Sequence, residues 1–190
     1  MNASFRSKIP LVCTLGMALV LLGACSTPLK KAVAAPHVCP PKYPAPYLNT
    51  ALGFGICLPA KLHSGNASGH PAGSVVFDGF AVPSGTNLRS KSLVIEPAAS
   101  EFAQGAEAFG HLTADGVSFQ RLKASDAGAG HRALHIIYTV KISGKRLTFD
   151  FIHNSVNVGN FDPANRPAEF NEAAQVRITE EIMATFHRAH

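Results

Sequence analysis

Two strand-like stretches, ALHIIYTVKI (residues 133–142) and KRLTFDFIHNSV (residues 145–156), decide the fold of this chain. Apolar and polar side chains alternate in both, and Ser143-Gly144 lies between them, which predicts a β-hairpin with a two-residue turn. Residues whose numbers add up to 287, such as Ile142 and Lys145, then lie opposite each other. The first face of this hairpin carries Leu134, Ile136, Tyr138, Val140, Leu147, Phe149, Phe151 and His153. The second face carries His135, Ile137, Thr139, Lys141, Arg146, Thr148, Asp150 and Ile152, and we expect it to be mostly solvent-exposed while the first face joins the core.

Shorter elements are predicted on both sides of the hairpin. Alternation or short apolar runs indicate strands at residues 52–58, 75–82, 93–95 and 117–122. Ser100 is a candidate cap for a short helix, and a terminal helix starting near Pro167 carries apolar side chains four residues apart: Phe170, Ala174, Ile178, Ile182 and Phe186. The predicted fold class is therefore α+β, with an antiparallel sheet of about six strands and two helices packed on it.

The N-terminus has the form of a secretory signal peptide. Arg6 and Lys8 precede an apolar run at residues 9–22, which is shorter than the ~20 apolar residues of a comfortable membrane span. The sequence Leu22-Gly23-Ala24-Cys25 that closes it resembles the lipobox of bacterial lipoproteins. This resemblance implies a diacylglycerol lipid on Cys25 and cleavage before it. The alternative is an ordinary signal peptide with an incidental cysteine.

The chain then divides into three parts. Residues 1–24 are the predicted lipoprotein signal peptide, and residues 25–46 are the lipidated cysteine and a spacer with six prolines. An extended proline-rich chain rises ~3.1 Å per residue, so this spacer could hold a domain roughly 60 Å from a membrane. Residues 47–190 are predicted to be a single domain.

Cysteine usage agrees with an oxidising compartment outside the cytoplasm. Cys13 leaves with the signal peptide and Cys25 carries the lipid, so Cys39 and Cys57 remain. We expect these two to form a disulfide worth on the order of 3 kcal/mol. Two unpaired buried thiols remain an alternative, whereas the absence of a CxxC spacing argues against a metal site.

The charge does not indicate nucleic acid as a partner. The chain has a formal net charge of +5, and removal of residues 1–24 leaves 15 basic against 12 acidic residues. Lys30 and Lys31 follow the lipid site, where they could contact anionic headgroups or serve only as solvated linker charges. Because Ser26 rather than Asp follows Cys25, we favour the periplasmic face of the outer membrane.

Three segments resemble small bacterial lipoproteins of the PsbP-like type. They are LGFGICLP (residues 52–59), the long hairpin, and IMATF (residues 182–186), and the resemblance extends loosely over residues 47–187. It implies an α/β/α or α+β sandwich that binds or assists a partner, generally without catalysis. These motifs concern packing, so no functional residue is transferred from that family.

No catalytic or metal-binding constellation stands out. His131 and His135 share one strand face but lie ~13 Å apart, too far to hold one ion. Glu180 and Glu181 are adjacent on a helix and point to different sides. No phosphate-binding loop and no nucleophile elbow is present. We therefore predict no catalytic residue, no metal ligand and no cofactor.

The function predicted from these features is that of a non-catalytic envelope lipoprotein that binds a macromolecular partner. The membrane is engaged through Cys25, and the partner is expected to be an envelope protein or a cell-wall component, in an inhibitor, immunity or assembly role. Candidate binding residues lie at the hairpin tip and on the second face: Lys141, Lys145, Arg146, Ile137 and Ile152. The alternative is a periplasmic hydrolase or metal-binding lipoprotein with a cluster formed by His63, His70, His111 or His153.

Overall fold

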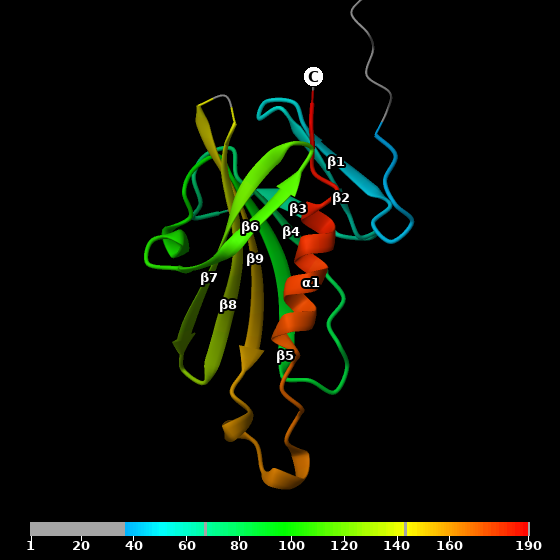
Figure 1. Ribbon diagram of the computed structural model, residues 1–190. Coiled ribbons are helices and arrows are strands. Elements are labelled where there is room, and N and C mark those ends of the chain that lie inside the picture. The colour runs from blue at the N-terminus through cyan, green and yellow to red at the C-terminus, as the bar shows by residue number, and fades with distance from the viewer. Residues whose placement is uncertain (1–36, 67, 143, 190) are drawn as a thin grey trace, which may run out of the picture. The chain divides into compact units, whose positions relative to one another are not determined.

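The computed structural model describes residues 37–66, 68–142 and 144–189, in which two antiparallel sheets pack with one α-helix (Figure 1). The larger sheet has the strand order β3-β4-β5-β9-β8-β7-β6. Its strands are β3 (His63–Asn66), β4 (Val75–Asp78), β5 (Leu88–Glu96), β6 (Glu107–Ala114), β7 (Val117–Gly128), β8 (His131–Ile142) and β9 (Lys145–Val156). The smaller sheet, in the order β1-β2-β10, contains β1 (Ala45–Asn49), β2 (Phe54–Leu58) and β10 (His187–Arg188). The helix α1 spans Glu172–Met183, and the 3₁₀ turns are η1 (Glu101–Ala103), η2 (Val158–Asn160) and η3 (Pro163–Asn165). Within the residues described, no helix is long and apolar enough to cross a bilayer.

The predicted hairpin is confirmed together with its register. β8 and β9 pair without interruption from Ile142 opposite Lys145 to His131 opposite Val156. Gly144 has φ of +78°, a left-handed conformation that a glycine adopts without steric cost in a tight turn. The pairing therefore places the two predicted faces on opposite sides of the sheet.

The predicted fold class, a six-stranded α+β sheet with two helices, is wrong. The fold is mostly β, with a three-stranded and a seven-stranded sheet and a single α-helix in the described part of the chain. The segment expected to form the first helix makes only η1 and then enters β6. Ser100 does cap η1, since its Oγ accepts a hydrogen bond from the Phe102 N–H at 3.2 Å. Gly105, with φ of +82°, prevents the helix from continuing.

The first face of the large sheet forms the main core with α1. Asn171 caps this helix, because its Oδ1 accepts a hydrogen bond from the Ala174 N–H at 2.9 Å. Of the predicted apolar positions in this helix, Ile182 is buried and Ile178 packs against the core. Gln175, Thr179 and Met183 are buried as well, so the buried face is wider than the predicted one. Thr179 Oγ1 and the Tyr138 hydroxyl lie 2.8 Å apart and hydrogen-bond across the interface. The terminal helix is thus confirmed, although it is shorter than its apolar repeat suggested.

The predicted disulfide between Cys39 and Cys57 is present, with the two Cα atoms 5.6 Å apart. It joins the chain before β1 to Cys57 near the end of β2, and all five residues of this strand are buried. The packing begins upstream of residue 47, since Tyr43 is buried and β1 starts at Ala45. The signal peptide, the proposed lipid site and most of the spacer lie outside the described residues.

The second face is not the mostly solvent-exposed surface that the sequence predicted. Ile137 and Thr148 are fully buried there, and His135 and Asp150 are nearly so. The segment that carries η1 covers them: Thr148 Oγ1 donates a hydrogen bond to the Ala98 carbonyl at 2.6 Å, and the Phe102 ring stacks on the His135 ring with 3.9 Å between centroids. The alternating pattern located this face correctly, but a segment distant in sequence covers it.

Candidate functional site

The hairpin tip carries three cations that make no ion pair with any described residue. Lys141 and Arg146 lie directly opposite each other near the ends of β8 and β9, and Lys145 follows the turn. All three side chains are exposed. Adjacent like charges repel one another, so the approach of an anion lowers the electrostatic free energy of this surface.

A recess of about 520 Å³ lies beside this tip on the second face, and we call it the basic recess. Gln120 and Leu122 of β7, Thr139 of β8 and His111 of β6 line it together with the pair Lys141 and Arg146. None of its lining residues is an aspartate or a glutamate. It therefore combines two fixed cations with amide, hydroxyl and imidazole groups, which suits an anionic polar surface.

The two isoleucines of the predicted binding set lie elsewhere. Ile137 is fully buried beneath the η1 segment and is not available to a partner. Ile152 is half-buried and lines a separate pocket, together with Glu96 and Asp150. The structure thus brings Lys141, Lys145 and Arg146 together and separates both isoleucines from them.

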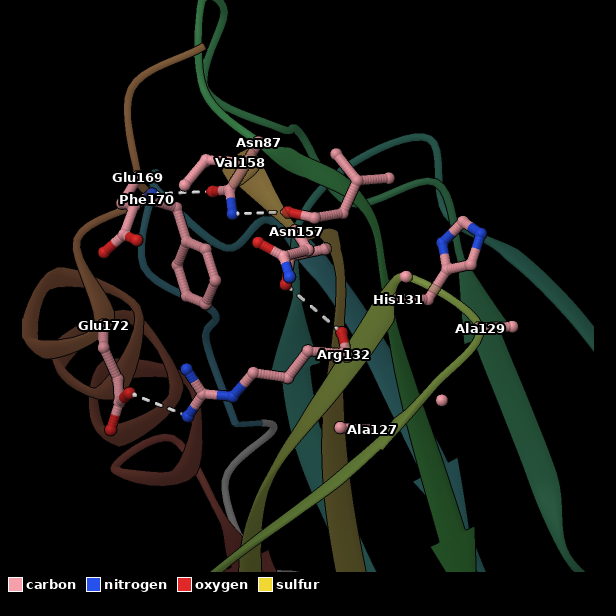
Figure 2. A pocket seen from close by; sticks show the side chains of 14 residues that line it. Asn87, Ala127, Ala129, His131, Arg132, Asn157, Val158, Glu169, Phe170 and Glu172 are labelled. Atoms are coloured by element: carbon pink, nitrogen blue, oxygen red, sulfur yellow. Dashed lines mark hydrogen bonds and ion pairs between the residues drawn. The ribbon is translucent and has the colours of Figure 1, made fainter. Parts of the chain in front are cut away.

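A larger cleft, of about 550 Å³, lies at the opposite end of the hairpin, where β8 begins and β9 ends. Figure 2 shows Arg132 reaching across it toward Glu172, beside the ring of Phe170. The Arg132 guanidinium lies 3.6 Å from the Glu172 carboxylate, which Lys123 also contacts at 3.2 Å. Arg132 and Glu172 are thus paired within this cleft, whereas Glu169, which also lines it, makes no ion pair with a described residue. The cleft therefore has no pair of unpaired cations like that of the basic recess.

Asn87 has a structural role at the edge of that cleft. Its Nδ2 donates a hydrogen bond to the Val156 carbonyl, and its Oδ1 accepts one from the Phe170 N–H. The start of β5, the end of β9 and the approach to α1 are therefore joined through one buried amide (Figure 2). Both hydrogen bonds of this side chain therefore serve the fold.

The four histidines of the alternative hydrolase or metal reading lie on different elements. His63 is exposed on β3, His111 is exposed on β6, and His70 lies in the loop before β4. His153 is 3 % exposed in the core. Burial and the nearby Lys91 charge lower the pKa of His153 to about 4, so its ring is neutral at pH 7. In the part of the chain that the structure describes, no three His, Cys, Asp or Glu side chains are placed to hold a metal ion.

Two histidine–carboxylate pairs were not predicted. His135 Nδ1 lies 2.9 Å from an oxygen of Asp150, and His70 Nδ1 lies 2.6 Å from Glu96 Oε1. The hairpin register places His135 and Asp150 on the same face as diagonal neighbours, so this pair could have been found from the sequence. The second pair joins a loop to a strand, and no local pattern indicates it.

The comparisons with known proteins leave the family of this chain open. No protein-family model matches the sequence, and no curated protein matches it. A crystal structure of a protein from Bacteroides thetaiotaomicron is similar over 77 % of this chain, with a TM-score of 0.43 and 10 % sequence identity. The match covers 48 % of that protein, so this chain spans about half its length. A similarity this weak carries no argument about function.

Proposed function

We propose that this protein is a non-catalytic envelope lipoprotein whose domain binds an anionic macromolecular partner through the hairpin tip and the basic recess. The observation that carries this proposal is the set of exposed cations Lys141, Lys145 and Arg146, unpaired among the described residues, beside a recess without any carboxylate in its lining. Surface cations more often alternate with anions, which neutralise them.

The exposed cations of the hairpin tip would act mainly on the rate and the specificity of association. Exposed cations steer an anionic partner toward the site and disfavour cationic ones, while the open recess provides hydrogen-bonding groups at close range. Exposed charges are screened within ~8–10 Å at physiological ionic strength, so binding should weaken as salt is added.

The wider setting of the proposal comes from the sequence. A lipid on Cys25 and a proline-rich spacer would hold the domain in the periplasm, with the outer membrane favoured. The partner would then be an envelope protein or a cell-wall component. An inhibitor or immunity role and an assembly role both agree with this placement.

Reversing the charge of the tip should weaken partner binding. The variant Lys141→Glu/Lys145→Glu/Arg146→Glu replaces three exposed cations, and we expect an affinity loss of about tenfold or more at low salt that shrinks as salt rises. The measurement is the affinity of the mature protein for a partner isolated from envelope extracts, at several salt concentrations. A matched control is Lys61→Glu/Arg166→Glu/Arg177→Glu, since these three cations are also exposed but do not line the recess.

Histidine variants separate this proposal from the alternative. Alanine at His63 and His70, which do not line the basic recess, should leave envelope function nearly intact if the domain only binds through that recess. If those changes abolish function while the charge reversal has no effect, a histidine-dependent hydrolase or metal-binding protein becomes the better interpretation.

The lipid anchor has its own test. Cys25→Ser removes the only thiol of the Leu22-Gly23-Ala24-Cys25 motif, so we expect an unlipidated protein that no longer partitions into detergent. Metabolic labelling with palmitate measures this directly. Labelling that persists in Cys25→Ser would show that the motif is not the lipidation site.

A further inference from the structure

A second concave site lies on the other side of η1. This turn contributes Ala103 to the basic recess, whereas Glu101 and Phe102 line a pocket of about 260 Å³. We call it the acidic pocket. Two buried carboxylates also line it: Glu96 of β5 and Asp150 of β9, with side chains 7 % and 4 % exposed.

The register explains how these carboxylates come together. Glu96 pairs with Thr148 across β5 and β9, so Asp150 is its diagonal neighbour on the same face. Diagonal neighbours of an antiparallel pair lie about 7–8 Å apart at Cα, a spacing that one cationic group can bridge. Two adjacent strands of the large sheet therefore fix the geometry of the site.

Both buried carboxylates have fewer hydrogen-bond donors than they can accept. Among the described residues, the Asp150 carboxylate hydrogen-bonds only to His135 Nδ1, and that of Glu96 only to His70 Nδ1, through Oε1. Glu96 Oε2 has no hydrogen-bond partner in the described part of the chain, and it is not one of the fully buried polar atoms, so it stays accessible from the pocket that Glu96 lines. An ionised carboxylate offers about four acceptor positions, so both side chains keep acceptor positions that a ligand could occupy.

The charge of the pocket is also unbalanced. Three carboxylates line it, those of Glu96, Asp150 and Glu101, against the single imidazole of His70, and none of the lining residues is a lysine or an arginine. Apolar groups complete its wall: the ring of Phe102 and the side chain of Ile152. The site thus lacks N–H donors and positive charge, and a cationic ligand with several N–H groups would supply both.

We infer that the acidic pocket binds an organic cation, namely an ammonium or guanidinium group carried by a short alkyl chain. Such a group donates three or more hydrogen bonds to Glu96 and Asp150, while its alkyl part lies against Ile152 and the Phe102 ring attracts its charge. A metal ion fits less well, since the described residues provide no set of three metal ligands. This site is separate from the basic recess, and neither proposal depends on the other.

The test uses the mature protein and n-butylammonium as the probe, with n-butanol as a neutral ligand of similar size. In an NMR titration we expect saturable shifts of the amide signals of Glu96, Phe102 and Ile152 with the amine, and none with the alcohol. Glu96→Gln should weaken amine binding about tenfold or more, because it removes the charge and an acceptor oxygen. The matched control Glu172→Gln removes a charge outside the pocket and should leave amine binding unchanged.

A second variant keeps the test decisive if Glu96→Gln does not fold. Ile152→Lys places an ammonium group of the chain's own beside the two carboxylates, so the probe should no longer bind. Equal responses to the amine and the alcohol, or unchanged amine binding in Ile152→Lys, would overturn the inference. So would the absence of any saturable response in the folded protein, or the same amide shifts with Mg²⁺ or Zn²⁺ alone.

Discussion

Replacing Phe149 by alanine is expected to lower the free energy of unfolding by about 3–5 kcal/mol. The side chain is fully buried in β9 on the first face of the sheet. Its ring makes edge contacts with three other rings, at centroid distances of 5.3 Å to Phe54, 6.0 Å to Phe119 and 6.1 Å to Phe186. These belong to the small sheet, to β7 and to the segment after α1, so the cavity left by truncation would touch three parts of the core.

Urea unfolding of Phe149→Ala and the parent protein measures this loss. Leu48→Ala provides the control, since Leu48 is one of the large apolar side chains that remain exposed, and its truncation should change stability by no more than about 0.5 kcal/mol. A loss below about 1 kcal/mol for Phe149→Ala would mean that the ring is not buried as the structure places it.

The sequence predicted best those features that depend on neighbouring residues. Alternation over 133–142 and 145–156 indicates strands, and the Ser143-Gly144 turn aligns them, so the register followed without any distant contact. The pairing of Cys39 with Cys57 followed from counting cysteines in an oxidising compartment. These two predictions needed only the alternation of side chains along the chain and the number of cysteines.

Features that depend on distant packing were missed. Phe102, Ala106 and Phe109 have helical spacing, but Gly105 and Gly110 make a helix costly there, and pairing with β7 provides β6 with its hydrogen bonds instead. The covered second face is a similar case. An alternating strand shows which side chains share a face, but not which segment later packs on that face.

Some parts of the candidate site could likewise be predicted from the sequence, and others could not. The cations of the hairpin tip could be named from the sequence, since both sides of the turn carry basic residues. The basic recess and the acidic pocket could not, because each combines strands with the η1 segment. Ile137 illustrates the error that follows: an apolar residue on a predicted outer face suggested a binding surface, whereas it is part of the interior.

Acid should destabilise this protein through His153, by about 3 kcal/mol between pH 7 and pH 4. Burial, which is the largest cause, and the charge of Lys91 directly opposite on β5 lower the pKa of the folded-state ring from 6.5 to about 4. Nδ1 of this ring is buried without a hydrogen-bond partner in the described residues, so the ring stays neutral inside the fold.

The direction of this pH effect follows from the protonation of His153 in the folded and the unfolded chain. Below pH 6.5 the unfolded chain binds a proton at His153, whereas the folded protein binds it only near pH 4, so the free energy of unfolding falls as the pH decreases through this window. Each pKa unit corresponds to about 1.4 kcal/mol, and the shift from 6.5 to about 4 gives about 3 kcal/mol. Above pH 7 this group should add no pH dependence.

His153→Phe removes the proton-binding group and keeps a ring beside Phe170, whose centroid lies 6.5 Å from that of His153. Urea unfolding at pH 7, 5.5 and 4 should show that this variant loses about 3 kcal/mol less than the parent protein over the same range. Met183→Leu, a core change without a titratable group, should shift the free energy of unfolding equally at every pH. Parallel curves for His153→Phe and the parent protein would mean that His153 does not have a lowered pKa, and the acid sensitivity would then arise from other groups.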